Sequence, residues 1–163
     1  MTPDTLERAR KIRLLVLDVD GVLTDGGLYY GAGGESLQRF HVHDGAGIKA
    51  VMAAGIAVAV ISARRTPAVT ARMNELGVET VIQGEENKLE ALRGLAGEMG
   101  IGLDAVACIG DDTTDVSMMR GAGLAIAVAD AREPAVEAAH YQTSANGGNG
   151  AVRETCDMLL LAR

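Results

Sequence analysis

Five short apolar segments recur along the chain, and segments of helical character separate them. Each segment is apolar on both faces, which is typical of strands covered on both sides in a parallel sheet. Strands and helices in alternation predict a doubly wound, mainly parallel α/β fold, whose ligands bind at the carboxyl ends of the strands. The predicted strands are residues 13–19, 56–62, 79–83, 105–110 and 124–128. The predicted helices are residues 45–54, 66–76, 86–99, 113–120, 131–139 and about 149–162.

The size and charge of the chain narrow the function further. Its 163 residues fit a single domain, 1–163. The formal charge of −7 argues against binding to nucleic acid or to an acidic membrane, because no basic stripe offsets it. We expect neither a signal peptide nor a membrane span, and we predict a cytoplasmic protein. Cys108 and Cys156 are expected to be reduced thiols.

The segment 25–44 interrupts the alternation of strands and helices. Two strand-like pieces flank its GAGG turn, which predicts an inserted β-hairpin. The segment holds three of the four aromatic residues of the chain, Tyr29, Tyr30 and Phe40. A lone two-stranded hairpin is marginal in water, so we expect this one to pack against another subunit.

Carboxylates gather at the predicted strand ends. Asp18 and Asp20 close the first strand and lie on the same side of it, because strand side chains alternate with a period of two. The fourth strand ends in GDDTTD, which contains Asp111, Asp112 and Asp115. Several carboxylates at one sheet edge repel one another unless a cation lies among them. An all-oxygen set of this kind suits Mg²⁺.

Two more polar residues lie at the ends of neighbouring elements. Ser62 ends the second strand, and Lys88 opens the helix that follows the third. Taken alone, Ser62 could cap the next helix and Lys88 could be a solvated helix residue. Their position at strand ends, together with both acidic motifs, favours one shared site.

These residues resemble the four motifs of the haloacid dehalogenase superfamily. DVDGVLTDG is similar to the first motif, DxDGxxT, and Ser62, Lys88 and GDDTTD match the other three in order. The resemblance covers about residues 12–162 and implies a Mg²⁺-dependent phosphatase. It implies that Asp18 is the nucleophile that forms an aspartyl-phosphate, and that Asp20 is the general acid and base.

The resemblance also implies which groups bind the cation. Asp18, the backbone carbonyl of Asp20 and Asp111 would be the metal ligands. Asp112 and Asp115 would lie behind these ligands or bind the cation through water.

The resemblance further implies that Ser62, Lys88 and backbone N–H groups hold the phosphoryl oxygens. Ala63 replaces the glycine usual at this turn and still offers its N–H. Arg64 follows it, and a guanidinium can bind a carboxylate through two hydrogen bonds. We therefore expect Arg64 to bind the carboxylate of a sugar-acid phosphate; the alternative is a solvated arginine at a helix start.

Only 25 residues separate Ser62 from Lys88, and the hairpin is the one insertion after the first motif, so the chain looks capless. In detail it is similar to phosphatases of an eight-carbon keto sugar acid phosphate in lipopolysaccharide biosynthesis. FHVHDGAGIK, QGEENKLEAL and GGNGAVRE carry this similarity, which implies a homotetramer with packed hairpins. Relatives that act on nine-carbon acids typically have Glu in place of Arg64, and such an activity is the alternative.

Two other classes share some of these features. A phosphoacceptor receiver domain carries its phosphorylated Asp after the third strand, but that strand ends here in VIQG. A non-catalytic relative of the phosphatases is expected to lack Asp18, Asp20 or Lys88, and all three are present.

The sequence also departs from the family in places. His43 stands where Arg is common, and the sequence ends at Arg163 without a polar tail that would close a neighbouring site. We interpret His41 and His43 as polar residues on one hairpin face rather than a metal pair. Arg153 either contacts a ligand across a subunit boundary or simply lies at a helix start.

Overall fold

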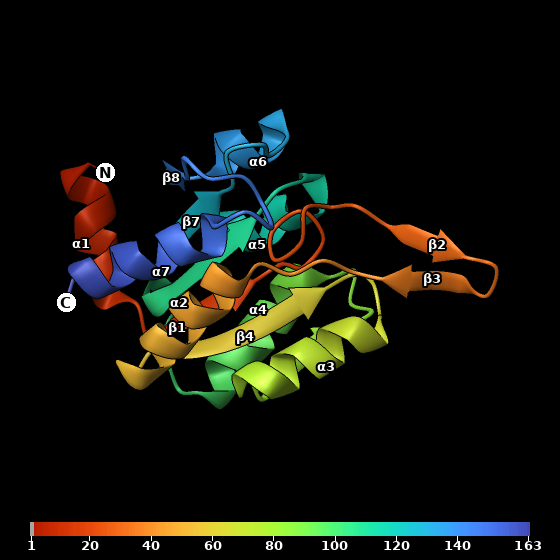
Figure 1. Cartoon of the computed structure of the whole chain (residues 1–163). Coiled ribbons are helices and arrows are strands. Elements are labelled where there is room, and N and C mark those ends of the chain that lie inside the picture. The colour runs from red at the N-terminus through yellow and green to blue at the C-terminus, as the bar shows by residue number, and fades with distance from the viewer. Residues whose placement is uncertain (1) are drawn as a thin grey trace.

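A six-stranded parallel sheet forms the centre of the molecule (Figure 1). The computed structural model describes residues 2–163, apart from the side chains at positions 35 and 36. The strand order is β5-β4-β1-β6-β7-β8, which confirms the predicted doubly wound sheet. The strands are β1 (Leu14–Leu17), β4 (Ala57–Ser62), β5 (Thr80–Gln83), β6 (Val106–Gly110), β7 (Leu124–Ala127) and β8 (Tyr141–Gln142).

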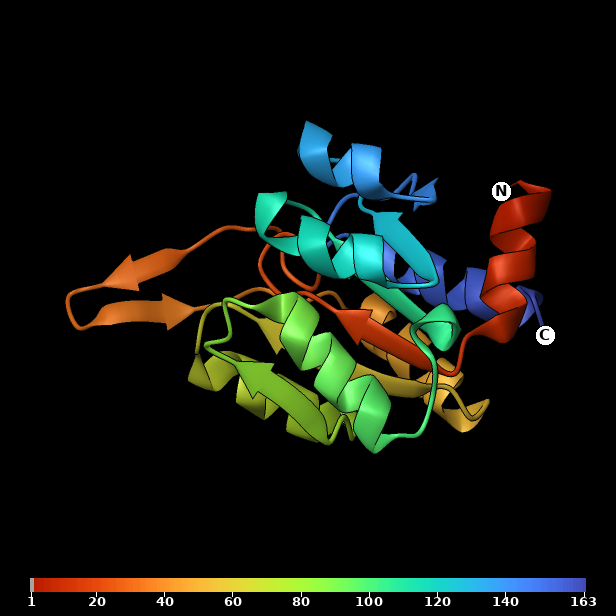
Figure 2. The ribbon, with the colours of Figure 1, turned by 180° about the vertical axis from the view of Figure 1, so that it is seen from behind.

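Helices cover both faces of the sheet, as Figures 1 and 2 show from opposite sides. One face carries α2 (Val42–Ala53), α3 (Pro67–Leu76) and α7 (Ala151–Leu161). The other carries α4 (Lys88–Glu98), α5 (Val116–Gly121) and α6 (Glu133–Ala138), with the short 3-10 turns η1 (Leu103–Ala105) and η2 (Thr113–Asp115) before β6 and α5. The four central strands β4, β1, β6 and β7 therefore bury residues on both sides, which explains their apolar runs.

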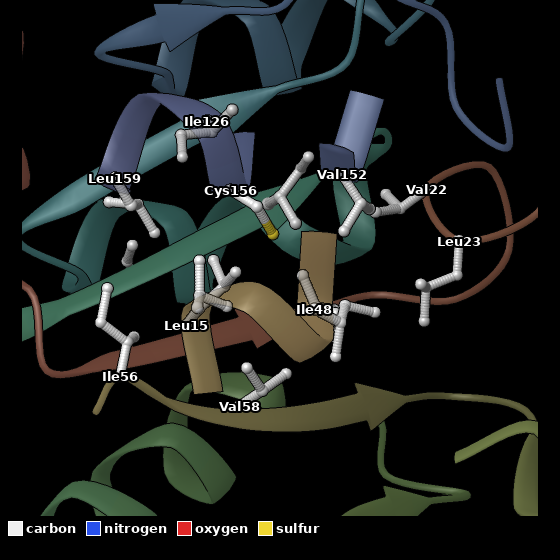
Figure 3. Close-up of a cluster of buried hydrophobic side chains, with 14 of the residues drawn as sticks. Leu15, Val22, Leu23, Ile48, Ile56, Val58, Ile126, Val152, Cys156 and Leu159 are labelled. Carbon is white, nitrogen blue, oxygen red and sulfur yellow. The ribbon is translucent and has the colours of Figure 1, made fainter. Parts of the chain in front are cut away.

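The core is divided by the sheet into two clusters. Within β1, Leu15 points into the cluster beneath α2 and α7, and Val16 into the cluster beneath α4 and α5. Figure 3 shows the first cluster, where Ile48 of α2 and Cys156 of α7 lie close to Leu15. Cys108 lies in the second cluster, so the two buried cysteines are on opposite faces of the sheet.

An additional helix, α1 (Pro3–Lys11), precedes the first strand and was not predicted. Its sequence is mostly charged, and it buries only Thr5 and Ala9. The start signals are nevertheless present, because Thr2 accepts a hydrogen bond from the Thr5 N–H and Pro3 is the first helical residue. In the part of the chain that is described, no helix combines the length and the apolar character needed to span a bilayer.

The inserted hairpin consists of β2 (Tyr29–Gly31) and β3 (Gly34–Leu37) and extends away from the sheet (Figure 1). It is shorter than the predicted segment 25–44, because α2 already begins at Val42. The ring of His41 accepts a hydrogen bond from the N–H of His43 and caps this helix, so the two histidines do not share a hairpin face as expected.

The aromatic residues of the segment also separate. Phe40 packs against the core, whereas Tyr29 and Tyr30 are exposed on the hairpin. No cap domain lies between the elements that the structure describes, in agreement with the prediction of a capless chain.

Candidate active site

The loop after β1 positions the two aspartates of the first motif. The N–H of Asp18 donates to the carbonyl of Ile109, which holds the loop beside β6. The buried hydroxyl of Thr24 donates to the Val19 carbonyl at 3.3 Å and accepts from the N–H groups of Gly21 before it and Gly26 after it. These bonds explain the Thr of the motif, since its side chain closes the turn that carries Asp20.

Gly21 in this loop has a φ of +86°, a conformation that other residues rarely adopt. A Cβ at this position would also collide with the carboxylate of Asp111. Glycine is therefore needed for Asp111, at the end of β6, to approach the first motif.

A cavity of about 180 Å³ opens at the carboxyl ends of β1, β4 and β6. Its lining contains all seven site residues predicted from the sequence, together with Asp112 and Thr114. The complete lining is Asp18, Asp20, Ser62, Ala63, Arg64, Lys88, Asp111, Asp112 and Thr114. Thr114 was not singled out, although it lies within the GDDTTD motif.

Lys88 forms a buried ion triad at the base of the cavity. Its Nζ lies 2.7 Å from Oδ1 of Asp18 and 2.6 Å from Oδ1 of Asp115, and the residue is 1% exposed. Burial alone lowers the pKa of Lys88, but the charges of the two carboxylates outweigh it and raise that pKa above its usual range. The triad fixes the rotation of the Asp18 carboxylate and supplies a permanent positive charge beside it.

Asp115 supports the site from behind. Its Oδ2 accepts hydrogen bonds from the backbone N–H groups of Asp111 at 3.0 Å and Asp112 at 3.4 Å, and its Oδ1 binds Lys88. With both oxygens engaged and the side chain fully buried, Asp115 shapes the loop that presents Asp111. This geometry agrees with the expected place of Asp115 behind the ligands.

The crowding of carboxylates has a clear electrostatic effect. Burial, with the nearby charge of Asp115, raises the pKa of Asp18 to about 7. Burial, with the charges of Asp18 and Asp115, raises the pKa of Asp111 to about 8. One oxygen from each of these three side chains lies within 4.8 Å of the others. The oxygens of Asp18 and Asp111 in this cluster fit a divalent cation, whose charge would favour the ionised carboxylates, while Asp115 keeps its bonds to Lys88 and to the loop.

The second motif forms the opposite wall of the cavity. The hydroxyl of Ser62 accepts a hydrogen bond from the N–H of Arg64 at 3.2 Å, which tightens the turn after β4 and leaves Ala63 exposed at the cavity. The guanidinium of Arg64 lies 3.5 Å from Oδ1 of Asp20. Arg64 is thus close to the group expected to act as general acid.

Arg153 is not part of this cavity. Its guanidinium binds Asp157 at 2.9 Å, and its backbone N–H donates to Asp44. It lines a separate hollow on α7 with Tyr141.

The fold and the site together define a hydrolase of the haloacid dehalogenase type. A family model described as haloacid dehalogenase-like hydrolase matches residues 78–154. This range covers the third and fourth motifs, with Lys88 and Asp111 among its residues.

Curated relatives narrow this class to one family. The chain is 45% identical to the 3-deoxy-D-manno-octulosonate 8-phosphate phosphatase of Salmonella typhimurium over 163 residues, which is 100% of this chain and 87% of that protein. It is equally similar to the enzyme of the same name from Escherichia coli. The chain belongs to the family of 3-deoxy-D-manno-octulosonate 8-phosphate phosphatases.

Solved structures agree with this assignment. The phosphatase of this name from Moraxella catarrhalis, in complex with magnesium, phosphate and the sugar acid, has a TM-score of 0.97 and 40% identity, over 100% of this chain and 94% of that one. The cobalt-bound enzyme of Haemophilus influenzae has a TM-score of 0.92 and 41% identity, over 95% and 91% of the two chains.

Proposed function

We propose that this chain hydrolyses 3-deoxy-D-manno-octulosonate 8-phosphate to the free sugar acid and phosphate, with Mg²⁺ as cofactor, in the biosynthesis of lipopolysaccharide. The observation that carries the proposal is the gathering of all four motifs at one cavity, in a chain 45% identical to such an enzyme over its whole length. The net negative charge fits an enzyme that acts on a small molecule rather than on nucleic acid. The two buried, free cysteines fit a cytoplasmic location.

Asp18 attacks phosphorus and forms an aspartyl-phosphate, which divides the hydrolysis into two easier steps. Lys88 holds the carboxylate of Asp18 in place and balances the charge of the phosphoryl oxygens. Asp20 protonates the departing alcohol and then takes a proton from the water that hydrolyses the intermediate. The hydroxyl of Ser62 and the N–H of Ala63 hold phosphoryl oxygens, where negative charge spreads in the transition state.

The cation would be held by the carboxylates of Asp18 and Asp111 and by the backbone carbonyl of Asp20. When bound, Mg²⁺ supplies positive charge for the phosphoryl oxygens. The raised pKa values of Asp18 and Asp111 support this set, because crowded carboxylates of this kind gain most from a cation.

Substrate choice is assigned to Arg64. It lies at the rim of the cavity and offers a planar guanidinium to the carboxylate of the sugar acid. A nine-carbon keto acid 9-phosphate is the alternative substrate, and the arginine in place of glutamate favours the eight-carbon acid.

Phosphate release from a panel of eight- and nine-carbon sugar phosphates tests this assignment. We expect the eight-carbon substrate to have the highest kcat/KM, with activity lost on chelation of Mg²⁺. Arg64→Glu should lower that kcat/KM by at least roughly 10- to 100-fold, because it removes a charge-assisted interaction with the substrate and places a second negative charge beside Asp20. Arg65→Glu, the same change at the exposed neighbour, is the control. Equal activity on the nine-carbon substrates would contradict the specificity.

We also propose that the chain assembles through its hairpin into a homotetramer. Apolar side chains that would pack in such an interface are exposed on the hairpin and just beside it. They are Leu28 (45% exposed), Tyr29 (50%), Tyr30 (69%), Leu37 (67%) and Val42 (70%). Burying this surface would stabilise the assembly, since exposed apolar patches of this kind mark interaction sites.

Light scattering at micromolar concentration is expected to give the mass of a tetramer. The double variant Tyr30→Ser, Leu37→Ser should shift the mass to smaller species, because it removes apolar area from the hairpin. Leu161→Ser is the matched control, since Leu161 is 78% exposed but lies at the end of α7. A stable monomer of the unaltered chain would contradict the assembly.

A further inference from the structure

Gln38, which lies just after β3, joins the hairpin to the active site. Its amide Nε2 donates to Oδ1 of Asp20 at 3.0 Å, and its amide oxygen accepts from the hydroxyl of Thr66 at 2.7 Å. We propose that Gln38 is a positioning residue that fixes the carboxyl group of Asp20 for proton transfer. The proposal rests on the proposed function, in which Asp20 is the general acid and base.

The contacts of Thr66 determine the orientation of the amide. Thr66 is 6% exposed, and its Oγ accepts from the N–H of Val69 as the cap of α3. The hydroxyl proton is therefore directed to the amide oxygen of Gln38. The N–H of Thr66 in turn donates to the side chain of Gln83 at 2.8 Å. Gln38 is thus anchored to the rigid start of α3 and to β5.

The next residue, Arg39, anchors the backbone at the base of the hairpin. The guanidinium of Arg39 donates at 3.2 Å to each of three acceptors, the carboxylate of Asp25, the carbonyl of Gly148 and the side chain of Asn149. The base of the hairpin is therefore tied both to the loop of the first motif and to the loop 144–150, which precedes α7. Gln38 is therefore held through its side chain by Thr66 and through the backbone by the contacts of Arg39, so its amide can keep the carboxyl group of Asp20 in place.

The hydrogen bond from Gln38 fixes the rotation of the Asp20 carboxyl group. Because Oδ1 accepts from the amide at 3.0 Å, this oxygen is held on the side of Gln38. Arg64 also lies 3.5 Å from Oδ1, so both donors act on the same oxygen. Loss of the amide removes the closer of these two donors and lets the carboxyl group rotate away from the leaving oxygen.

The test compares two phosphate esters that differ in their need for an acid. Cleavage of an alkyl phosphate, such as the sugar-acid phosphate, would release a strongly basic alkoxide, so this leaving group requires a proton. Dinitrophenyl phosphate releases a weakly basic phenolate, which leaves without a proton. Gln38→Leu should lower kcat/KM for the alkyl ester by about 10- to 100-fold, as expected for a misplaced catalytic group, and leave kcat/KM for the aryl ester almost unchanged. The ratio of the two values does not depend on the folded fraction of the preparation.

Three further variants separate positioning from other roles. Gln38→Lys keeps a donor within reach of Asp20 but cannot accept from the hydroxyl of Thr66, so it is expected to restore only part of the ratio. Gln83→Leu removes only the outermost bond of the anchor, the one to the Thr66 N–H, and should change the ratio by much less than Gln38→Leu does. Asp20→Asn should lower kcat/KM for the alkyl ester far more than kcat/KM for the aryl ester. If both fall equally, the proposed function of Asp20 is wrong, which is a different result from a failure of the role of Gln38.

The opposite results would overturn the proposal. An equal loss on both esters in Gln38→Leu would indicate a merely structural role, and no loss on either would exclude any role. We also expect the Mg²⁺ concentration that gives half of the thermal stabilisation to be the same in Gln38→Leu and in the unaltered chain. A change in this concentration would place the effect at the metal site and contradict the assignment to Asp20.

Discussion

Asp18→Asn is expected to reduce phosphatase activity by roughly 10⁴- to 10⁶-fold, the range seen when a catalytic nucleophile or its activating partner is removed. The change conserves shape and keeps an oxygen that can accept a hydrogen bond from Lys88, which lies 2.7 Å from Oδ1. It removes the negative charge and hence the nucleophile. The loss should therefore appear in kcat, with the fold intact by circular dichroism.

Direct detection of the intermediate strengthens this experiment. Acid-quenched reactions of the unaltered chain should carry a phosphoryl group on the peptide that contains Asp18, and those of Asp18→Asn should not. Asp4→Asn is the control, because the same change is made at an exposed aspartate of α1. Full activity of Asp18→Asn would mean that the mechanism is wrong.

Lys88→Met is expected to abolish activity and to destabilise the protein by about 3–5 kcal/mol, the typical effect of breaking a buried ion pair. Lys88 is 1% exposed and binds two buried carboxylates. Methionine fills a similar volume, so the loss arises from the uncompensated charges of Asp18 and Asp115 rather than from a cavity.

The destabilisation by Lys88→Met should depend on pH. The pKa of Asp18 is about 7 in the folded chain, against an ordinary value of 3.8, and removal of the lysine raises it further because the lysine charge lowers it. Between pH 3.8 and about 7 the folded states of both proteins bind more protons than their unfolded states, so the free energy of unfolding of both falls as pH rises. Above about pH 7 this fall ends in the unaltered chain and continues in the variant, so the destabilisation should be smallest near pH 5 and largest above about pH 8.

Urea unfolding in the absence of divalent cations, at the two ends of this pH range, measures the effect. Lys49→Met provides the control, since Lys49 is exposed on α2. A loss of stability that is the same at both pH values would contradict the electrostatic explanation.

Most of the sheet could be predicted because three of its strands are fully buried and continuously apolar, Leu14–Leu17, Val106–Gly110 and Leu124–Ala127. The edge strand β8 has two residues, of which Gln142 is exposed, and was not predicted. The helix α1 escaped prediction because it buries one narrow edge and exposes charges. The start of α2 was misplaced because His41 and His43 alternate with other residues as in a strand, whereas the ring of His41 in fact caps the helix.

The candidate site could be predicted for a related reason. Residues such as Asp18 and Lys88 lie directly at element ends, so chain topology alone brings them together. Gln38 belongs to no motif, and its contact with Asp20 depends on how the hairpin leaves and rejoins the domain. Local sequence carries no sign of such a contact, because the two residues meet only through tertiary structure.

The volume of the cavity has a consequence for the catalytic cycle. At about 180 Å³ it is smaller than the roughly 300–1,000 Å³ of typical small-molecule sites, so it encloses a phosphoryl group and not an eight-carbon chain. Most of the sugar therefore remains outside, over the rim that carries Arg64. After cleavage the sugar acid has only its contacts at the rim to break, whereas phosphate lies within the cavity. We therefore expect phosphate to leave last and to inhibit the next turnover by occupying the same cavity.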